Sequence, residues 1–229
     1  MHPLDDADER IRRAREHLED LKPRIYELRG TVRDQVSLTR RPGFHTQPDG
    51  RKVRAVIGSV SGPINFPAPR RIRTLIGEVV QNLRTALDYL VYELARFDAK
   101  RIIEGTQFPI VDLEADFEKA RKKRLRGLNG EHIAMIKRLQ PCDGCQWTGM
   151  LRDLSNPDKH RELTAVKSPI LVAPSPGSTE AILAGKDVDV QGDVTISITF
   201  PDGTPVIEGL ELFQSQAAQT IYEFKSEFQ

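Results

Sequence analysis

The stretch from Arg70 to Phe97 constrains the fold more than any other part of the chain. Its apolar residues recur at intervals of three and four, as they must when a helix buries one broad face. These residues are Ile72, Leu75, Ile76, Val79, Val80, Leu83, Ala86, Leu87, Leu90, Val91 and Leu94. The polar stripe that remains contains Gln81, Arg84, Thr85, Asp88 and Tyr92. A long, mostly buried helix needs other elements around it, so the sequence predicts a helical body.

A second helix is predicted near the N-terminus, where apolar residues follow a heptad pattern. They are Ile11, Ala14, Leu18, Leu21, Ile25, Leu28 and Val32. Pro23 lies within this pattern, so we expect a kink or a break near Leu21. The apolar seam has two interpretations. The helix either lies on the core of its own chain or also pairs with a second copy in a homodimer.

The middle of the chain predicts a hairpin followed by short helices. The turn residues 48–50 precede an alternating run at Val53, Ala55 and Ile57, which is typical of a β-hairpin, and we interpret the glycine-rich stretch 58–63 as a loop. After an extended segment, 106–110, come three expected helices. They cover 113–125, 130–140 (capped by Asn129 and stopped at Pro141) and 147–155.

The last third of the chain predicts strands and a closing helix. We expect residues 157–166 to continue helically, and the stretches 168–176 and 186–206 to form strands. Val188, Val190, Val194, Ile196 and Ile198 alternate there. A final amphipathic helix is expected over 206–227. The predicted fold class is therefore α+β, with an N-terminal β-hairpin, a helical bundle, and a C-terminal antiparallel β-meander with a last helix. The segments are 1–41, 42–69, 70–167 and 168–229.

Composition indicates a cytoplasmic protein without a membrane partner. No apolar run approaches the roughly 18 residues of a membrane-spanning helix, and the acidic start lacks the apolar region of a secretory signal. Residues 168–229 hold two basic and nine acidic residues, a net charge of −7, so residues 1–167 carry +8. The basic excess is concentrated at 70–73 and 121–126. This division favours either a body that binds a polyanion such as RNA or simply two solvated faces.

Cys142 and Cys145 have the C-x-x-C spacing of a zinc knuckle. His132 and His160 are the available further ligands, but no second pair of cysteines exists. Two reduced cysteines in a loop are the simpler interpretation, and the sequence indicates no cofactor.

The densest chemistry lies at 151–163, LRDLSNPDKHREL. On a helix, Asn156 and His160 would share a face, with Arg152 one turn earlier. A histidine can act as general acid or base, and an arginine can hold a phosphate. Asp158, Lys159 and Arg161 are supporting candidates. The alternative is structural, because Asn-Pro-Asp is a common helix start. Arg84 and Asp88 could then form a partly buried polar network with His160 or Lys159.

This stretch resembles the motif helix of HEPN domains, whose signature is R-N-x-x-x-H. Asn156 and His160 match the asparagine and histidine, whereas Ser155 stands where the family has arginine. Arg152, Arg84 or Arg161 would have to replace that arginine. The segments NLRTALDYL, TQFPI and NPDKHR also resemble a group of uncharacterised bacterial proteins with NLRSALDHL and N-x-D-K-H-R segments. The HEPN resemblance implies a helical bundle, a composite site between two subunits, and RNA cleavage in toxin–antitoxin or phage-defence systems.

Three functions are therefore open. The first is a HEPN-like, RNA-directed protein, extending to a metal-independent endoribonuclease with His160 as acid and base. Its partners would be RNA, a second copy of the chain, and a protein such as an antitoxin. The second is a non-catalytic binding or oligomerisation module in which NPDKHR is structural. The third is a protein that binds a small ligand or nucleotide between the helical body and the strands.

Overall fold

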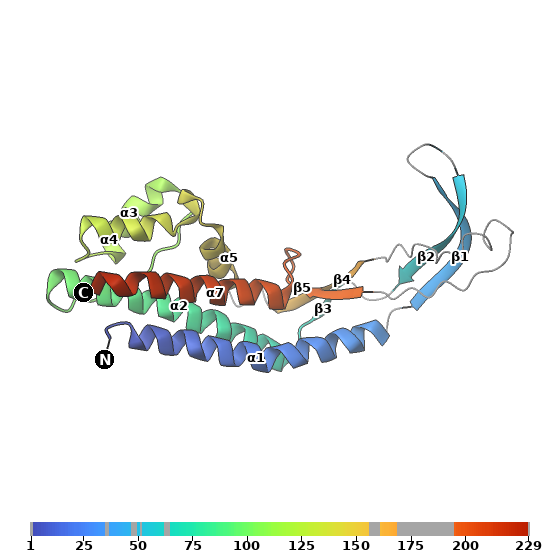
Figure 1. Ribbon diagram of the computed structural model, residues 1–229, viewed down its shortest axis with the longest axis horizontal. Coiled ribbons are helices and arrows are strands. Elements are labelled where there is room, and N and C mark those ends of the chain that lie inside the picture. The colour runs from blue at the N-terminus through green and yellow to red at the C-terminus, as the bar shows by residue number, and fades with distance from the viewer. Residues whose placement is uncertain are drawn as a thin grey trace.

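A computed structural model describes residues 2–34, 37–46, 50, 52–61, 65–155, 161–168 and 195–228. Three long helices form its body: α1 (Asp5–Asp34), α2 (Arg70–Ala99) and α7 (Val206–Phe224). They lie side by side, and both ends of the chain lie at the same end of this bundle (Figure 1). No helix in the described part of the chain is long and apolar enough to span a membrane.

Helix α2 lies at the centre of the core, as its apolar pattern predicted. All eleven apolar positions expected to be buried are buried, together with Ala95. The helix ends at Lys100, which has a left-handed backbone conformation with φ of 55°. Most of its buried side chains expose no more than a few per cent of their surface, so α1, α7 and the shorter helices cover this helix from several sides.

Helix α1 packs along α2 through its heptad seam. Six of the seven seam residues are buried, and Leu28 is partly buried against the same core. Of the kink or break expected near Leu21, the break is wrong, because one continuous helix runs through Pro23, and the kink stays a prediction. The seam contacts α2 and α7 of the same chain, which is the first of the two interpretations. The homodimer therefore stays a prediction without this seam as its support.

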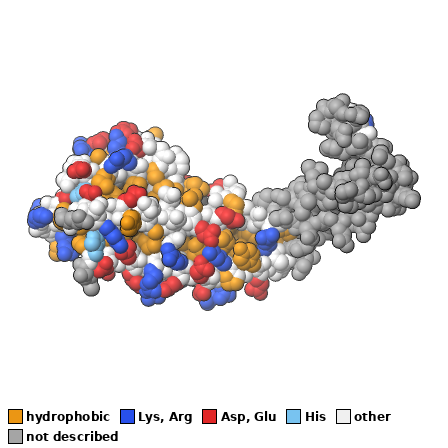
Figure 2. Space-filling model, viewed as in Figure 1, with side chains coloured by type: hydrophobic (Ala, Val, Ile, Leu, Met, Phe, Trp, Pro, Cys, Tyr) orange, Lys and Arg blue, Asp and Glu red, His pale blue; other side chains and the backbone are white. Residues whose placement is uncertain are grey.

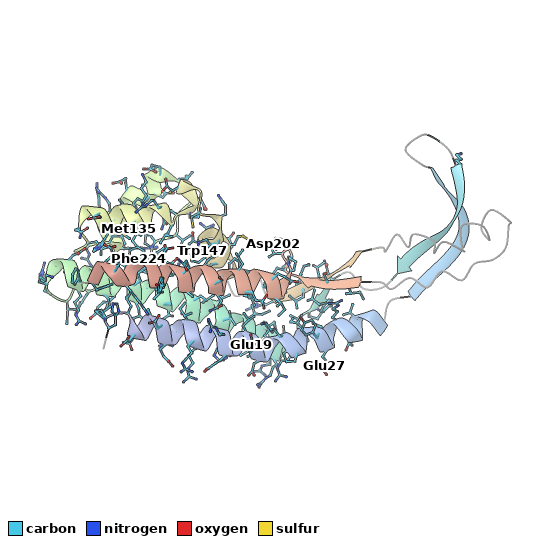
Figure 3. All side chains as sticks on the ribbon, in the orientation of Figure 1. Glu19, Glu27, Met135, Trp147, Asp202 and Phe224 are labelled. Carbon is cyan, nitrogen blue, oxygen red and sulfur yellow. The ribbon has the colours of Figure 1, made fainter. Side chains whose placement is uncertain are left out.

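Four short helical elements lie on one side of the bundle. They are α3 (Glu114–Arg124), α4 (Gly130–Arg138), the 3₁₀ turn η1 (Pro141–Asp143) and α5 (Gln146–Leu154). The helices α3, α4 and α5 were expected and η1 was not, and the Asn129 side chain caps α4 by accepting from the His132 N–H at 2.8 Å. Trp147 of α5 lies over α7, whereas Glu19 and Glu27 lie on the outer face of α1 (Figure 3). A further 3₁₀ turn, η2 (Lys225–Phe228), follows α7.

A three-stranded antiparallel sheet closes the bundle near the start of α7. Its order is β3 (Asn65–Pro67), β4 (Glu162–Ser168) and β5 (Thr195–Thr199). The helix expected over 157–166 is wrong from Glu162 onward, because β4 pairs with β3 on one side and β5 on the other. These strand partners come from distant parts of the chain and override the local helical signal.

The C-terminal strand prediction is confirmed where the structure describes it. Ile196 and Ile198 on β5 are both buried, as their alternation predicts. Residues 169–194, including Val188 and Val190, lie outside the described residues. The sheet combines strands from three different parts of the sequence, and one buried cluster joins it to α1, α2 and α7. The fold is α+β, as predicted.

The N-terminal hairpin is also confirmed. Strands β1 (Ser37–Thr46) and β2 (Lys52–Ser61) pair antiparallel, with Ser37 opposite Ser61 and Thr46 opposite Lys52. Gly50 has a φ of 84°, which suits the turn that the sequence predicted there. The loop expected over 58–63 is wrong for its first part, because β2 continues through Ser61. The pairing partner on β1 accounts for this difference.

Candidate functional site

Two polar residues of α2, Arg84 and Asp88, form hydrogen bonds with the backbone of the extended segment 106–112. Arg84 donates from Nη2 to the Phe108 carbonyl oxygen at 3.2 Å, and Asp88 accepts from the Phe108 N–H at 2.9 Å. Asp88 Oδ1 lies 3.9 Å from Arg84 Nη2. Two side chains one helical turn apart thus satisfy both backbone groups of a single residue whose own side chain is fully buried.

Burial determines the electrostatics of this pair. It raises the pKa of the Asp88 carboxyl, and Arg84, the Phe108 N–H and Arg124 oppose that effect only in part. Burial also lowers the pKa of Arg84, whose side chain is 14% exposed and whose Nη1 has no hydrogen-bond partner in the described part of the chain. Arg84 is therefore committed to the interior of the protein. This geometry supports the structural interpretation of Arg84 and Asp88, with a backbone segment as their partner.

Arg152, another candidate to replace the motif arginine, binds the other end of the same segment. Its Nη1 donates to Asp112 Oδ2 at 2.7 Å, and its Nε and Nη2 donate to Asp153 Oδ1 at 3.1 and 3.0 Å. Both carboxylates are on the same chain, and together they engage every nitrogen of the Arg152 guanidinium. Arg152 therefore joins α5 to segment 106–112, and a phosphate would have to compete with these two carboxylates for its guanidinium.

Neighbouring elements complete the attachment of segment 106–112. The Gln107 N–H donates to the Arg124 carbonyl at the end of α3, and the Val111 N–H donates to Gln140 Oε1. The Val111 carbonyl accepts from the Cys142 N–H. Segment 106–112 is therefore the point where α2, α3, η1 and α5 are connected, and the sequence predicted only the extended conformation of 106–110.

The centre of the motif, residues 156–160, lies outside the described residues, so Asn156, Asp158, Lys159 and His160 remain candidates on sequence grounds. What flanks them is clear. Helix α5 ends at Leu154 with Ser155 as its C-cap, and β4 begins at Glu162. The Arg161 carbonyl accepts from the Ala68 N–H just before α2. The motif segment thus connects a helix to a strand, which differs from the long motif helix that the sequence predicted.

Cys142 and Cys145 are free, half-buried cysteines in and after η1. Burial raises the pKa of both thiols, which disfavours the thiolate that a metal or an electrophile needs. Across the described ranges, no three His, Cys, Asp or Glu side chains gather in a way that could hold a metal ion.

A buried network around His132 was not among the predicted sites. His132 Nδ1 donates to Asp98 Oδ2 at 2.7 Å, and Nε2 lies 3.4 Å from Glu227 Oε2 on η2. The Asn129 N–H and side-chain amide donate to the two oxygens of Asp98. The histidine has a carboxylate on each side and, among the described residues, no hydroxyl or thiol partner, so the network fastens α4 and η2 to the end of α2. Its members are too far apart in sequence for a local pattern to connect them.

The basic stretch at 121–126 forms the end of α3 and the turn beyond it. We define the basic run as Lys119, Arg121, Lys122, Lys123, Arg124 and Arg126. Only Phe117 of α3 is buried, so this helix gives most of its surface to solvent. Lys119 and Arg121 pair with carboxylates one turn earlier on α3, whereas Lys122 and Lys123 are exposed and form no ion pair within the described part of the chain.

On the face of the bundle that Figure 2 shows, basic and acidic side chains are interspersed. A shallow hollow between α1 and α2, for example, is lined by Asp6, Glu9, Arg10, Arg13 and Tyr89. Arg13 pairs with Glu9, and the Arg10 guanidinium lies over the Tyr89 ring. These groups compensate one another and do not favour a ligand of one charge.

Comparison with protein-family models, with curated proteins and with solved structures found no match. The resemblance of residues 151–163 to HEPN domains therefore stays a prediction that rests on the sequence motif.

Proposed function

We propose that this protein binds RNA through the basic run at the end of α3. The observation that carries the proposal is the pair Lys122 and Lys123, which are exposed and form no ion pair with any described residue, beside four further cations. Unpaired cations close together on an exposed helix favour a polyanion, because each phosphate they neutralise releases a bound counterion. RNA is the polyanion that the HEPN resemblance implies.

The helix dipole alone does not account for this run. One or two cations near the C-terminus of a helix stabilise it, and acidic residues in its first turn do the same at the other end. Helix α3 has Glu114 and Asp116 in its first turn, but its last turn consists of four consecutive cations, Arg121–Arg124. Adjacent like charges repel, so a run of this length goes beyond what capping requires.

The test is RNA binding as a function of salt. We expect Lys122→Glu/Lys123→Glu to weaken binding of a labelled single-stranded RNA and to reduce the slope of log affinity against log salt by about 1 to 2. The matched control, Arg15→Glu/Arg29→Glu, makes the same charge change at two exposed positions of α1. Equal affinities and slopes for wild type and the α3 variant, or no binding by wild type at low salt, would refute the proposal.

Cleavage of the bound RNA is a second, finer proposal, with His160 as acid and base and Asn156 as its helper. It rests on the motif resemblance alone, and we place it after binding. The described cations that it would recruit, Arg84 and Arg152, have partners within the chain. The test is incubation of RNA with wild type and His160→Ala, with and without chelator. Loss of cleavage only in the variant, insensitive to chelator, would support catalysis. Absence of cleavage by wild type leaves the non-catalytic binding module.

A further inference from the structure

The β1–β2 pair stands apart from the rest of the fold. It is a separate two-stranded sheet, and neither strand pairs with any other strand in the part of the chain that the structure describes. Its extensive contacts are between β1 and β2 themselves, and the ribbon projects beyond the bundle at the end opposite the termini (Figure 1). A lone two-stranded hairpin is only marginally stable in water, so a partner that bound it would also stabilise it.

The charge of this ribbon is strongly positive. Between Ser37 and Ser61 the sequence holds five basic residues, Arg40, Arg41, Arg51, Lys52 and Arg54, and a single acidic residue, Asp49, which gives a net charge of +4. This excess is half of the +8 carried by residues 1–167. A partner of complementary charge is therefore an anion with several charges.

The register places most of these cations on one face together with an aromatic residue. Phe44 pairs with Arg54, Thr46 with Lys52, and Arg40 with Gly58. Positions two apart along a strand, and positions directly opposite across an antiparallel pair, share a face. Arg40, Phe44, Lys52 and Arg54 therefore belong to one face, whereas Arg41, opposite Ile57, belongs to the other.

We propose that the β1–β2 ribbon is an arm that binds a single-stranded segment of RNA. Arg40, Lys52 and Arg54 would contact phosphates, and Phe44 would stack on a base, which is the combination that proteins use for single-stranded nucleic acids. The choice of RNA over another polyanion rests on the proposed function. The arm itself is a second surface, distinct from the basic run on α3.

The same charges have a competing explanation. Among the described strands, both strands of the ribbon are edges, and lysine, arginine and proline on edge strands prevent pairing with other chains. β1 contains Pro42 as well as its arginines. Edge protection requires charge but no particular face and no aromatic residue, so the two explanations predict different variants to be defective.

The experiment uses the full chain and a labelled oligoadenylate, with affinity measured by fluorescence anisotropy at fixed salt. We expect Phe44→Ala to weaken binding about tenfold and Phe44→Trp to retain it, because a stacking ring is kept. Arg40→Ala should weaken binding more than its matched control, Arg41→Ala, on the opposite face. Circular dichroism should show the helical content of wild type in every variant, because the substituted residues lie on strands and not on a helix.

Several outcomes would overturn the proposal that the arm binds RNA. One is equal affinity for Arg40→Ala and Arg41→Ala, and another is unchanged affinity for Phe44→Ala. A third is Arg40→Ala/Lys52→Ala/Arg54→Ala binding as tightly as wild type while light scattering shows self-association, because that pattern is edge protection. Polyglutamate displacing oligoadenylate at equal charge concentration would also overturn the choice of nucleic acid.

The α3 variant in the same assay separates this inference from the proposed function. Loss of binding in Lys122→Glu/Lys123→Glu with full binding by the arm variants overturns the arm and supports the α3 surface. The reverse result supports the arm and overturns the α3 surface. If the arm variants and the α3 variant all bind with wild-type affinity, both proposed surfaces are overturned.

Discussion

Burial disfavours the charged form of Asp88, and the position of this residue explains why the carboxylate is nevertheless present. Its carboxylate is held in a place where burial raises its pKa, yet it remains there because the Phe108 N–H would otherwise be unsatisfied. Arg84 performs the same service for the Phe108 carbonyl. Charged side chains on an otherwise apolar helix are thus used to anchor an irregular segment, whose backbone groups have no strand or helix to bond with.

Removing the Asp88 carboxylate should therefore destabilise the fold. We expect Asp88→Ala to lower the free energy of unfolding by about 1–3 kcal/mol, because it leaves the Phe108 N–H without an acceptor. Asp88→Asn keeps an acceptor oxygen and should cost less. Urea denaturation of the three proteins measures this order. Equal stability of Asp88→Ala and wild type would mean that the anchor contributes nothing.

The raised pKa of Asp88 also predicts a pH dependence. Since the folded carboxyl binds its proton more tightly than the unfolded one, its contribution to stability is greatest below its ordinary value of 3.8 and declines as pH rises through the raised folded value. Compared with Asp88→Asn, in which the other carboxyls are unchanged, wild type should gain stability as pH falls from neutral into that range. Denaturant midpoints for both proteins across this range provide the test, and a constant difference would contradict it.

Asn129 links a helix cap to the buried histidine network. Asn129→Ala removes the acceptor for the His132 N–H and the amide donor to Asp98, so we expect a loss of about 0.5–2 kcal/mol. Asn129→Ser restores a capping oxygen and should recover part of that loss. Thermal unfolding measures both variants. If Asn129→Ser were no better than Asn129→Ala, the contact with Asp98 would be the larger contribution.

Among the elements, α1 contains a proline that the sequence expected to break it. The continuous helix lacks the hydrogen bond that the Pro23 nitrogen cannot donate, and the side chain is exposed, so packing does not require it. We expect Pro23→Ala to stabilise the protein, by up to about 3 kcal/mol if the helix is otherwise regular. Glu27→Ala, on the same exposed surface, is the control and should change little. A destabilised Pro23→Ala protein would contradict this prediction and show that the proline contributes to the packing of α1.

Elements differ in how much of them the sequence could predict. The apolar pattern of α2 spans many turns, so it identifies both the helix and its buried residues. Strand β4 is short, and its residues follow an Asn-Pro pair that is typical of a helix start. Only its partners decide its conformation, and β3 and β5 come from distant segments. Similarly, Arg84 and Asp88 were recognised as a polar network, but their partner is backbone, which no residue pattern identifies.

At the scale of the whole molecule, η2 connects the two ends of the chain. Lys225 pairs with Asp8 at 2.6 Å, the Phe228 ring contacts those of His2 and Phe97, and Glu227 reaches His132. A chain shortened after Phe224 should lose about 1–3 kcal/mol, because aromatic pairs contribute roughly 0.5–1.5 kcal/mol each and exposed ion pairs less. Glu227→Gln alone should cause a smaller loss. Calorimetry measures the midpoint of thermal unfolding for both variants. An equal midpoint for the shortened chain and wild type would contradict the prediction.

The strand order of the small sheet has a consequence for how the molecule acquires its structure. Thr164 on β4 bonds to Asn65 on β3, a separation of 99 residues, whereas the heptad seam of α1 and the apolar face of α2 are continuous, local patterns. Closing so long a loop costs chain entropy before any strand contact repays it, and distant pairings slow folding. The helical bundle should therefore assemble early, with β4 seated between its two neighbours in the slow phase. In pulse-labelling hydrogen exchange, the amides of α2 would gain protection before those of β4.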